Sequence, residues 1–201
     1  MTRRLDFIVP GDPAQRTGGY LYDAHIVTEL RGLGWTVDVH GLPGRFPEAD
    51  AKARDALERT LAALPSGRQV VVDGLALGGL PEVAIRHGHR LALVALVHHP
   101  LADQRGLSLA RRHCLLASER AALATAGRVI TTSGHTARRL AGELKRGARN
   151  GDFSSSVVEV NSLFFMLARE REALWEAYFD TVERVARAAP RPDQLATLCR
   201  I

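Results

Sequence analysis

Polar residues suited to acid–base or hydroxyl-binding chemistry follow two short apolar runs. His98 and His99 come directly after the run 91–97, and Asp73 comes after the run 70–72. A histidine at the end of a strand can orient a hydroxyl group, accept its proton or bind a phosphate. Neighbouring residues of an extended segment point to opposite faces, so we expect at most one of the two histidines to face a cleft. Asp73 can accept a hydrogen bond from a sugar hydroxyl, but it is equally suited to a turn or a helix cap.

A pair of glycines follows the first apolar run of the chain, residues 5–9. Thr17, Gly18 and Gly19 stand just before a helical pattern of apolar residues. Two glycines let backbone N–H groups approach a ligand closely, and the N-terminus of the next helix favours an anion. The spacing is not GxGxxG, and no Lys-Ser/Thr pair follows, so the common nucleotide-binding fingerprints are absent. A plain loop that needs positive φ angles explains the pair equally well.

Ser133 follows a fifth apolar segment, residues 129–130. Its simplest role is to cap the helix that begins there, and ligand binding is the alternative. The chain shows no Ser-His-Asp arrangement with a nucleophile elbow, so a hydrolase has little support. No cysteine, aspartate or glutamate stands at a metal-ligand spacing from His98 and His99. We therefore predict no metal site and no cofactor.

Strand-like and helix-like segments alternate through residues 1–145. We expect strands at 5–9, 35–42, 70–72, 91–97 and 129–130, and helices at 20–33, 49–64, 108–126 and from 134 to about 143. This alternation is typical of a parallel sheet with helices on both faces. The sequence therefore predicts an α/β fold, a single Rossmann-like domain with a mainly parallel sheet flanked by helices. Ligands of such sheets bind beyond the carboxyl ends of the strands, where the polar residues named above stand.

The composition changes in residues 146–201. A basic turn at 146–151 precedes a predicted sixth strand at 157–160. A long amphipathic helix is then expected from Asn161 or Ser162 to about Ala189, where prolines end it. Its large apolar side chains are either core or a docking surface for a second copy or a partner chain.

Length, charge and cysteine usage limit the class of protein. The chain has 201 residues, 46% of them hydrophobic and 24% charged, which suits one globular domain. Its net charge of +5 favours anionic partners, but no nucleic-acid module is recognisable, so we predict no nucleic-acid binding. Two isolated cysteines and the lack of a long apolar run predict a cytoplasmic protein. Its basic surface suits a peripheral position at a membrane.

Four segments in this order resemble the N-terminal domain of a bacterial family-4 glycosyltransferase. They are FIVPGDPAQRTGGYLYDAHIVTELRGLGWTVDVHGLPGRFP (7–47), VVVDGLALGGLPE (70–82), LALVALVHHPLA (91–102) and GRVITTSGHTARRLA (127–141). Together they span about residues 5 to 141, and the first and third are the most specific. The resemblance implies a GT-B fold, in which two Rossmann-like domains face each other across a cleft. The N-terminal domain receives the acceptor and the C-terminal domain binds a nucleotide sugar.

The resemblance also implies roles for individual residues. Thr17, Gly18 and Gly19 would form the loop beneath the donor's diphosphate, and His98 or His99 would lie near the reacting sugar as the catalytic histidine. Tyr20, Asp73 and Ser133 are assigned to the acceptor. That acceptor would be a small molecule or a lipid-linked sugar. Such enzymes need no metal, because helix N-termini and basic side chains neutralise the leaving diphosphate.

The chain departs from the family pattern after residue 145. The family's second domain carries a basic pair that grips the diphosphate and a glutamate-containing stretch that holds the ribose, and neither is recognisable here. The protein is therefore expected to transfer sugar only when a partner supplies a donor domain. Alternatively, it is a non-catalytic accessory module or a truncated remnant. An unrelated methyltransferase or NAD-dependent oxidoreductase is disfavoured by the missing glycine fingerprint, and Asp38, the one candidate ribose ligand, lies inside its strand.

Overall fold

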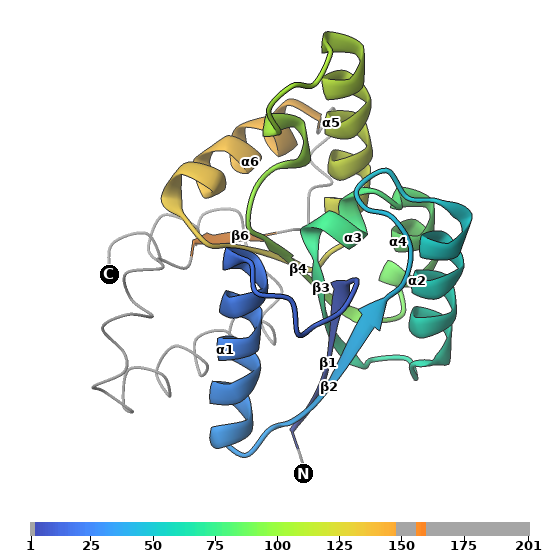
Figure 1. Ribbon diagram of the computed structural model, residues 1–201, viewed down its shortest axis with the longest axis vertical. Coiled ribbons are helices and arrows are strands. Elements are labelled where there is room, and N and C mark those ends of the chain that lie inside the picture. The colour runs from blue at the N-terminus through green and yellow to red at the C-terminus, as the bar shows by residue number, and fades with distance from the viewer. Residues whose placement is uncertain (1–2, 148–155, 160–201) are drawn as a thin grey trace.

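The computed structural model describes residues 3–147 and 156–159, which form a parallel sheet flanked by helices (Figure 1). The elements follow in the order β1 (Arg4–Pro10), α1 (Gly18–Gly32), β2 (Thr36–Leu42), α2 (Ala51–Ala63), β3 (Gln69–Asp73), α3 (Gly74–Gly78), α4 (Pro81–Gly88), β4 (Ala92–Val97), the 3₁₀ helix η1 (Leu101–Asp103), α5 (Leu109–Leu123), β5 (Arg128–Thr131), α6 (Gly134–Gly147) and β6 (Ser156–Glu159). The predicted α/β class and Rossmann-like sheet are confirmed.

The strand order creates a switch point in the middle of the sheet. Its six strands lie in the order β2-β1-β3-β4-β5-β6, and every neighbouring pair is parallel. The chain therefore moves from β1 to one side and then crosses back to the other side for β3. This order is that of flavodoxin-like sheets, extended by one strand, and differs from the 3-2-1-4-5-6 order of dinucleotide-binding domains. Ligands of such sheets bind at the carboxyl ends beside the switch point, here between β1 and β3.

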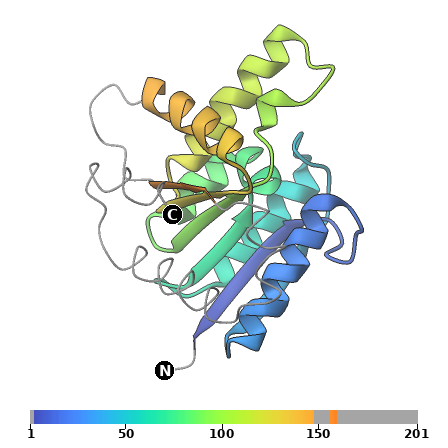
Figure 2. The same ribbon diagram turned by 90° about the vertical axis from the view of Figure 1, so that its left-hand side faces the viewer.

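Helices cover the two faces of the sheet unequally. Helix α1 lies on one face, and α2, α3 and α4 lie on the opposite face (Figures 1 and 2). The alternating residues of β1 divide accordingly: Phe7 packs with Val27 and Leu30 of α1, whereas Ile8 packs with the helices of the other face. β1 is almost wholly buried because it is covered on both sides, and this explains why it is apolar apart from Arg4 at its exposed start and the buried Asp6.

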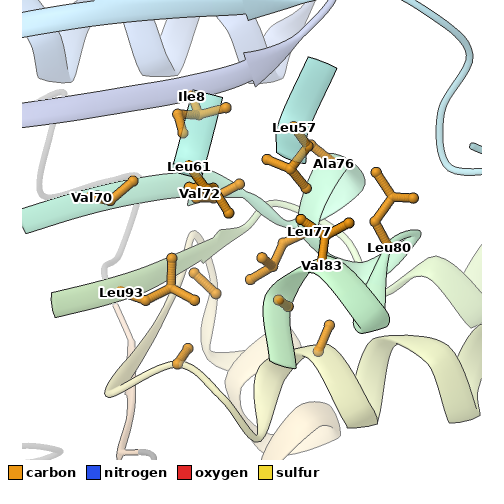
Figure 3. Packing of buried hydrophobic residues seen from close by; sticks show 14 of the residues in the cluster. Ile8, Leu57, Leu61, Val70, Val72, Ala76, Leu77, Leu80, Val83 and Leu93 are labelled. Atoms are coloured by element: carbon orange, nitrogen blue, oxygen red, sulfur yellow. The ribbon is translucent and has the colours of Figure 1, made fainter. Parts of the chain in front are cut away.

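The larger core lies on the face of α2, α3 and α4. Figure 3 shows its centre, where Ile8, Leu57, Leu61, Val70, Val72, Ala76, Leu77, Leu80, Val83 and Leu93 interdigitate. The branched side chains of the strands pack against the leucines of α2 and of the segment after β3. These residues are almost completely inaccessible to solvent, so this cluster contributes most of the apolar burial in the described part of the chain.

Local capping residues position the helices that follow the strands. Asp50 accepts a hydrogen bond from Ala53 N at the start of α2, and Ser108 accepts one from Arg111 N at the start of α5. Each side chain satisfies one of the N–H groups that a helix start leaves without an intrahelical partner. Capping thus fixes where each helix starts relative to the strand before it.

The structure adds two short helices to the sequence prediction and confirms the sixth strand. The segment between the third and fourth strands forms α3 and α4, which we did not predict, and the expected strand at 157–160 is β6, one residue earlier. The predicted helix from about 162 to 189 lies outside the described residues, and the boundary at 145 stays a prediction. In the part of the chain that the structure covers, none of the helices is both long and apolar enough for a membrane crossing.

Candidate functional site

The candidate site lies at the carboxyl ends of β1, β3 and β4. Asp73 is the last residue of β3, and His98 is the first residue after β4. Asp23 projects from the second turn of α1, the helix that follows the loop after β1. These three side chains meet although 75 residues separate Asp23 from His98. They converge because the parallel strands end at the same edge of the sheet and α1 starts there.

His98 is held between two carboxylates. Its Nε2 atom lies 2.9 Å from Asp23 Oδ1 and 3.7 Å from Asp73 Oδ2. An ionised carboxylate only accepts hydrogen bonds, so Nε2 carries a proton and donates it to Asp23. The ring of Tyr22 meets the imidazole edge-on, with 5.3 Å between ring centroids and an interplanar angle of 86°. Hydrogen bonding and ring contact together fix the orientation of the imidazole.

Burial and mutual charge shift the acid–base properties of this cluster. Burial raises the pKa of Asp73 to about 6, and the charge of Asp23 adds to this rise, while the opposing charge of His98 lowers it. Burial lowers the pKa of His98. The hydrogen bond to Asp23 and the charges of both aspartates together raise this pKa by more than burial lowers it, so it lies above the usual value. The charged groups behind these shifts include no lysine or arginine. The cluster can therefore hold protons near neutral pH.

Gly18 and Gly19 form the first turn of α1 and do not lie in a loop with positive φ. Both have negative φ angles, so that explanation of the pair is wrong. A Cβ atom on Gly19 would lie 3.4 Å from the His98 ring, which is tighter than most Cβ contacts. A Cβ atom on Gly18 would meet no atom within 4 Å among the described residues. Gly19 thus lies against the His98 ring, whereas no contact among the described residues explains Gly18.

Thr17 and Tyr20 border the same helix start. Thr17 is the N-cap residue of α1, but its side chain makes no capping hydrogen bond and is exposed. The Tyr20 hydroxyl donates a hydrogen bond to the carbonyl oxygen of Pro10, which ties the start of α1 to the end of β1. Burial, and then the charges of Asp73 and Asp23, raise the pKa of the Tyr20 phenol. Tyr20 thus lies within the electrostatic reach of the acidic cluster.

Asp73 and Ser133 also have structural roles as helix caps. Asp73 Oδ1 accepts a hydrogen bond of 2.6 Å from Leu75 N at the start of α3, which leaves Oδ2 facing His98. Ser133 Oγ accepts from Thr136 N at 3.2 Å and lies 3.0 Å from the Thr136 hydroxyl, so it caps α6. The structure therefore places Asp73 in the cluster, whereas the side-chain hydrogen bonds of Ser133 are with Thr136 of α6.

The two adjacent histidines occupy different environments. His98 is largely buried in the cluster, and His99 is exposed. The Thr132 hydroxyl donates to the carbonyl oxygen of His98 at 3.4 Å, which joins the segment after β5 to the segment after β4. Of the two candidate catalytic histidines, only His98 is brought to the carboxylates.

Glu119 binds the backbone of the segment that follows His98. This residue of α5 is 2% exposed, and its two carboxylate oxygens lie 3.1 and 3.2 Å from Leu101 N, which donates to them. Burial raises the pKa of Glu119 to about 7; the hydrogen bond from Leu101 opposes this rise, Asp103 adds to it and Arg139 opposes it. Glu119 therefore anchors η1, which begins three residues after His98.

Sequence reasoning found Asp73 and His98 but missed Asp23 and Glu119. Asp23 stands one helical turn after Gly19, on the same face of α1 as the buried residues Val27 and Leu30. An acidic residue at a position where an amphipathic helix normally carries an apolar one could therefore have indicated a site residue from the sequence. Glu119 lies on the buried side of α5 between Leu115 and Leu123 and carried the same signal.

A hollow of about 590 Å³ lies beside the edge strand β2, away from the carboxyl ends. Its charged side chains pair with one another: Arg4 with Asp38 at 2.8 Å, and Asp6 with His40 at 2.6 Å and Arg68 at 3.6 Å. These pairs compensate most of the charges of the hollow, and Arg31, which also lines it, donates to the carbonyl oxygen of Val37 at 2.7 Å. The cluster around His98 is therefore the stronger candidate for binding and catalysis.

Part of the predicted basic surface is engaged in ion pairs. Arg111 pairs with Glu48, and Arg139 pairs with Asp103 at 3.1 Å. Arg112 and Arg138 are exposed. The absence of nucleic-acid binding stays a prediction.

No protein-family model matches the chain, and none of the curated proteins matches it.

Proposed function

We propose that the protein is the acceptor-side half of a glycosyltransferase of the family-4 type and binds a sugar hydroxyl at Asp73 and His98. The observation that carries this proposal is the convergence of Asp23, Asp73 and His98 at the carboxyl ends beside the switch point. Carboxylates and an imidazole can bind hydroxyl groups and move their protons. The open space at Gly18 is consistent with a ligand that approaches the first turn of α1.

Within this proposal each polar group has a separate task. His98, aligned by Asp23, contacts the acceptor hydroxyl, and the carboxylate of Asp73 accepts a hydrogen bond from the sugar. Asp23 is a positioning residue, because its own hydrogen bond goes to His98. The first turn of α1 presents backbone N–H groups toward a diphosphate.

The charges of the site indicate that the donor is held mainly by another domain. Two carboxylates lie beside the start of α1, and they disfavour a diphosphate there unless positive charge is supplied. The charges that shift the pKa values of Asp73 and His98 include no lysine or arginine. A partner chain that carries a donor domain would supply the missing basic groups. We therefore expect transfer only in the presence of such a partner.

The test is a transfer assay with the purified full chain, candidate donor-domain chains and a panel of UDP- and GDP-sugars. Release of nucleoside diphosphate and the mass of the acceptor are followed together. We expect turnover only with chain and partner combined, a loss of at least about a hundredfold in H98Q, and near-normal turnover in the neighbouring variant H99Q. An absence of transfer in every combination, or tight binding of S-adenosylmethionine or NAD, would contradict the proposal.

A non-catalytic accessory module is the second candidate function. The uncompensated negative charge at the site favours it, since carboxylates suit neutral sugar hydroxyls better than a phosphate donor. This alternative predicts that the chain binds an acceptor sugar in isothermal titration and that H98Q weakens this binding, with no turnover alone or with partners. Turnover by the purified chain alone would exclude it.

A further inference from the structure

We propose that Asp23, Asp73 and His98 form a binding site for one divalent transition-metal ion, with Zn²⁺ and Mn²⁺ as the fitting cations. One donor atom from each residue lies within 4.8 Å of the other two. The residues come from α1, from the end of β3 and from the segment after β4. Because they are far apart in the sequence, only the fold brings them together. This inference rests on the geometry of the cluster and stands independently of the proposed function. It departs from the absence of a metal site predicted from the sequence, because that prediction did not include Asp23.

A second observation is the unsatisfied oxygen of Asp23. Oδ1 of this carboxylate accepts from His98, but Oδ2 is buried and meets no hydrogen-bond donor among the described residues. Asp23 is only 4% exposed as a residue. A buried carboxylate oxygen without a partner is costly, and a bound cation would remove this cost. A cation bound by Asp23 would therefore be stabilised by an oxygen that has no other partner among the described residues.

The spacing of the donor atoms suits a small cation. Two ligands of a tetrahedral zinc site lie about 3.4 Å apart when each metal–ligand bond is near 2.1 Å. The observed distances from His98 Nε2 are 2.9 Å to Asp23 and 3.7 Å to Asp73, which lie on either side of that value. Small side-chain rotations therefore bring the three atoms to one centre. The ion would take the place of the proton that His98 now shares with Asp23.

The donor set and the charge identify the class of cation. One imidazole nitrogen and two carboxylate oxygens suit Zn²⁺ or Mn²⁺, whereas Ca²⁺ and Mg²⁺ prefer oxygen-only ligands. Two carboxylates and a neutral imidazole carry a charge of −2, which one divalent cation neutralises. Three protein ligands leave at least one coordination position open for a ligand oxygen.

The experiment titrates the full chain with metal after treatment with a chelator. A C114S/C199S background removes both thiols of the chain, which would otherwise compete for zinc. Isothermal titration and thermal unfolding are measured with ZnCl₂, MnCl₂ and MgCl₂. We expect one Zn²⁺ or Mn²⁺ per chain with a rise in the unfolding temperature, and little effect of Mg²⁺. The variants D23N and H98Q are expected to weaken the affinity at least tenfold, and H99Q to leave it unchanged.

A measurement on the unmutated site guards against variants that fail to fold. In NMR spectra, bound Mn²⁺ broadens the signals of nuclei near it, so the ring signals of Tyr22 and His98 should disappear before those of the distant His40. The proposal is overturned if the wild-type chain binds neither Zn²⁺ nor Mn²⁺ at 1:1 stoichiometry, or if folded D23N and H98Q bind with unchanged affinity. Selective broadening elsewhere, with Tyr22 and His98 unaffected, would also overturn it. Failure of sugar transfer would leave this inference intact, because no step of the experiment depends on transfer.

Discussion

The side chains of Asp23, Asp73 and His98 bring two carboxylates and one imidazole together in a setting largely closed to water. In such a setting electrostatic interactions are strong, because solvent screens the charges less than at the surface. The cluster therefore attracts groups that donate hydrogen bonds or carry positive charge. Sugar hydroxyls and divalent cations meet this requirement, and a bare phosphate does not. Selectivity at the residue scale thus follows from the charge balance of three side chains.

Gly18 provides a test at the same scale. The variant G18A should change the unfolding temperature by no more than a few degrees, because its new methyl group meets no atom of the described structure. The methyl group would occupy the space through which a ligand approaches the start of α1. We expect kcat/KM in the partner-dependent transfer assay to fall by at least about tenfold. Thermal unfolding and transfer kinetics check both parts.

The matched control for this prediction is G32A. Gly32 ends the same helix, and a Cβ atom there also meets nothing within 4 Å. We expect G32A to keep both stability and kcat/KM. Equal losses in the two variants would mean that the space at Gly18 has no special role.

At this scale the sequence predicted some site residues and missed others for a physical reason. Asp73 and His98 stand where apolar strands end, and a parallel sheet brings such positions to one edge. Asp23 belongs to the buried face of α1, and its meeting with His98 depends on how the helix is rotated against the sheet. Helix rotation is set by the packing of Val27 and Leu30, which a single sequence does not specify.

At the scale of elements, η1 connects the cluster to the interior of the fold. This single turn follows the histidine segment, and its first N–H group donates to Glu119 of α5. Gly78 at the end of α3 packs against both Leu101 and Glu119, where a Cβ atom would be too close to Leu101. The position of His98 therefore depends on contacts among three elements: α3, η1 and α5.

Glu119 should make the stability of the fold fall as pH rises. Its folded pKa of about 7 lies above the usual value of 4.5, so between these pH values the folded chain holds a proton that the unfolded chain has lost. Stability contributed by this proton is present below pH 4.5 and is lost as pH rises toward 7. The variant E119Q lacks this dependence, and it should gain on the order of 3 kcal/mol relative to wild type between pH 5 and pH 8. Urea unfolding at several pH values measures this difference.

The control for Glu119 is E48Q. Glu48 is exposed and pairs with Arg111 on the surface, so its removal should follow the wild-type pH trend. The groups that face Glu119 from neighbouring elements are Asp103 and Arg139, which also pair with each other. A pH trend in E119Q identical to that of wild type would contradict the role of Glu119 and leave Asp73, whose pKa is also raised to about 6, as the group behind the trend.

Ser133 tests the cap of α6. The variant S133A should lose about 1 kcal/mol of stability, because the N–H group of Thr136 loses its acceptor. S133N should retain stability, since asparagine is an equally good cap and adds no charge near the acidic cluster. Thermal unfolding compares the two variants with wild type. A transfer or binding defect in S133N without a loss of stability would instead support the acceptor role assigned to Ser133 from the sequence.

The elements that the sequence did not predict are short. α3 has five residues and α4 has eight, and segments of this length show little more than one or two turns of periodicity. Asp73 and Pro81 mark their starts, as a side-chain cap and as a proline in the first turn. The longer strands and helices carried enough periodicity for their types to be predicted. Their order in the sheet followed from the structure alone.

At the scale of the whole molecule, the order β2-β1-β3-β4-β5-β6 makes one edge of the sheet the place where distant segments meet. The core on the face of α2, α3 and α4 holds the strands rigidly, and α1 on the other face delivers Asp23. The site therefore combines one residue from the face that α1 covers with two residues that end or follow core strands. Motion of α1 against the sheet would separate Asp23 from the other two residues.

The central core provides the last prediction. Leu57 is fully buried and packs with Leu61, Ala76 and Leu77 (Figure 3), so L57A should lower the free energy of unfolding by about 2–5 kcal/mol. Leu109 is 75% exposed at the start of α5, and L109A should stay within about 0.5 kcal/mol of wild type. Urea unfolding with an unchanged m-value would assign the loss in L57A to the native core. Similar losses in both variants would mean that Leu109 is covered in solution, and cross-linking of the full chain would then identify the segment or partner that covers it.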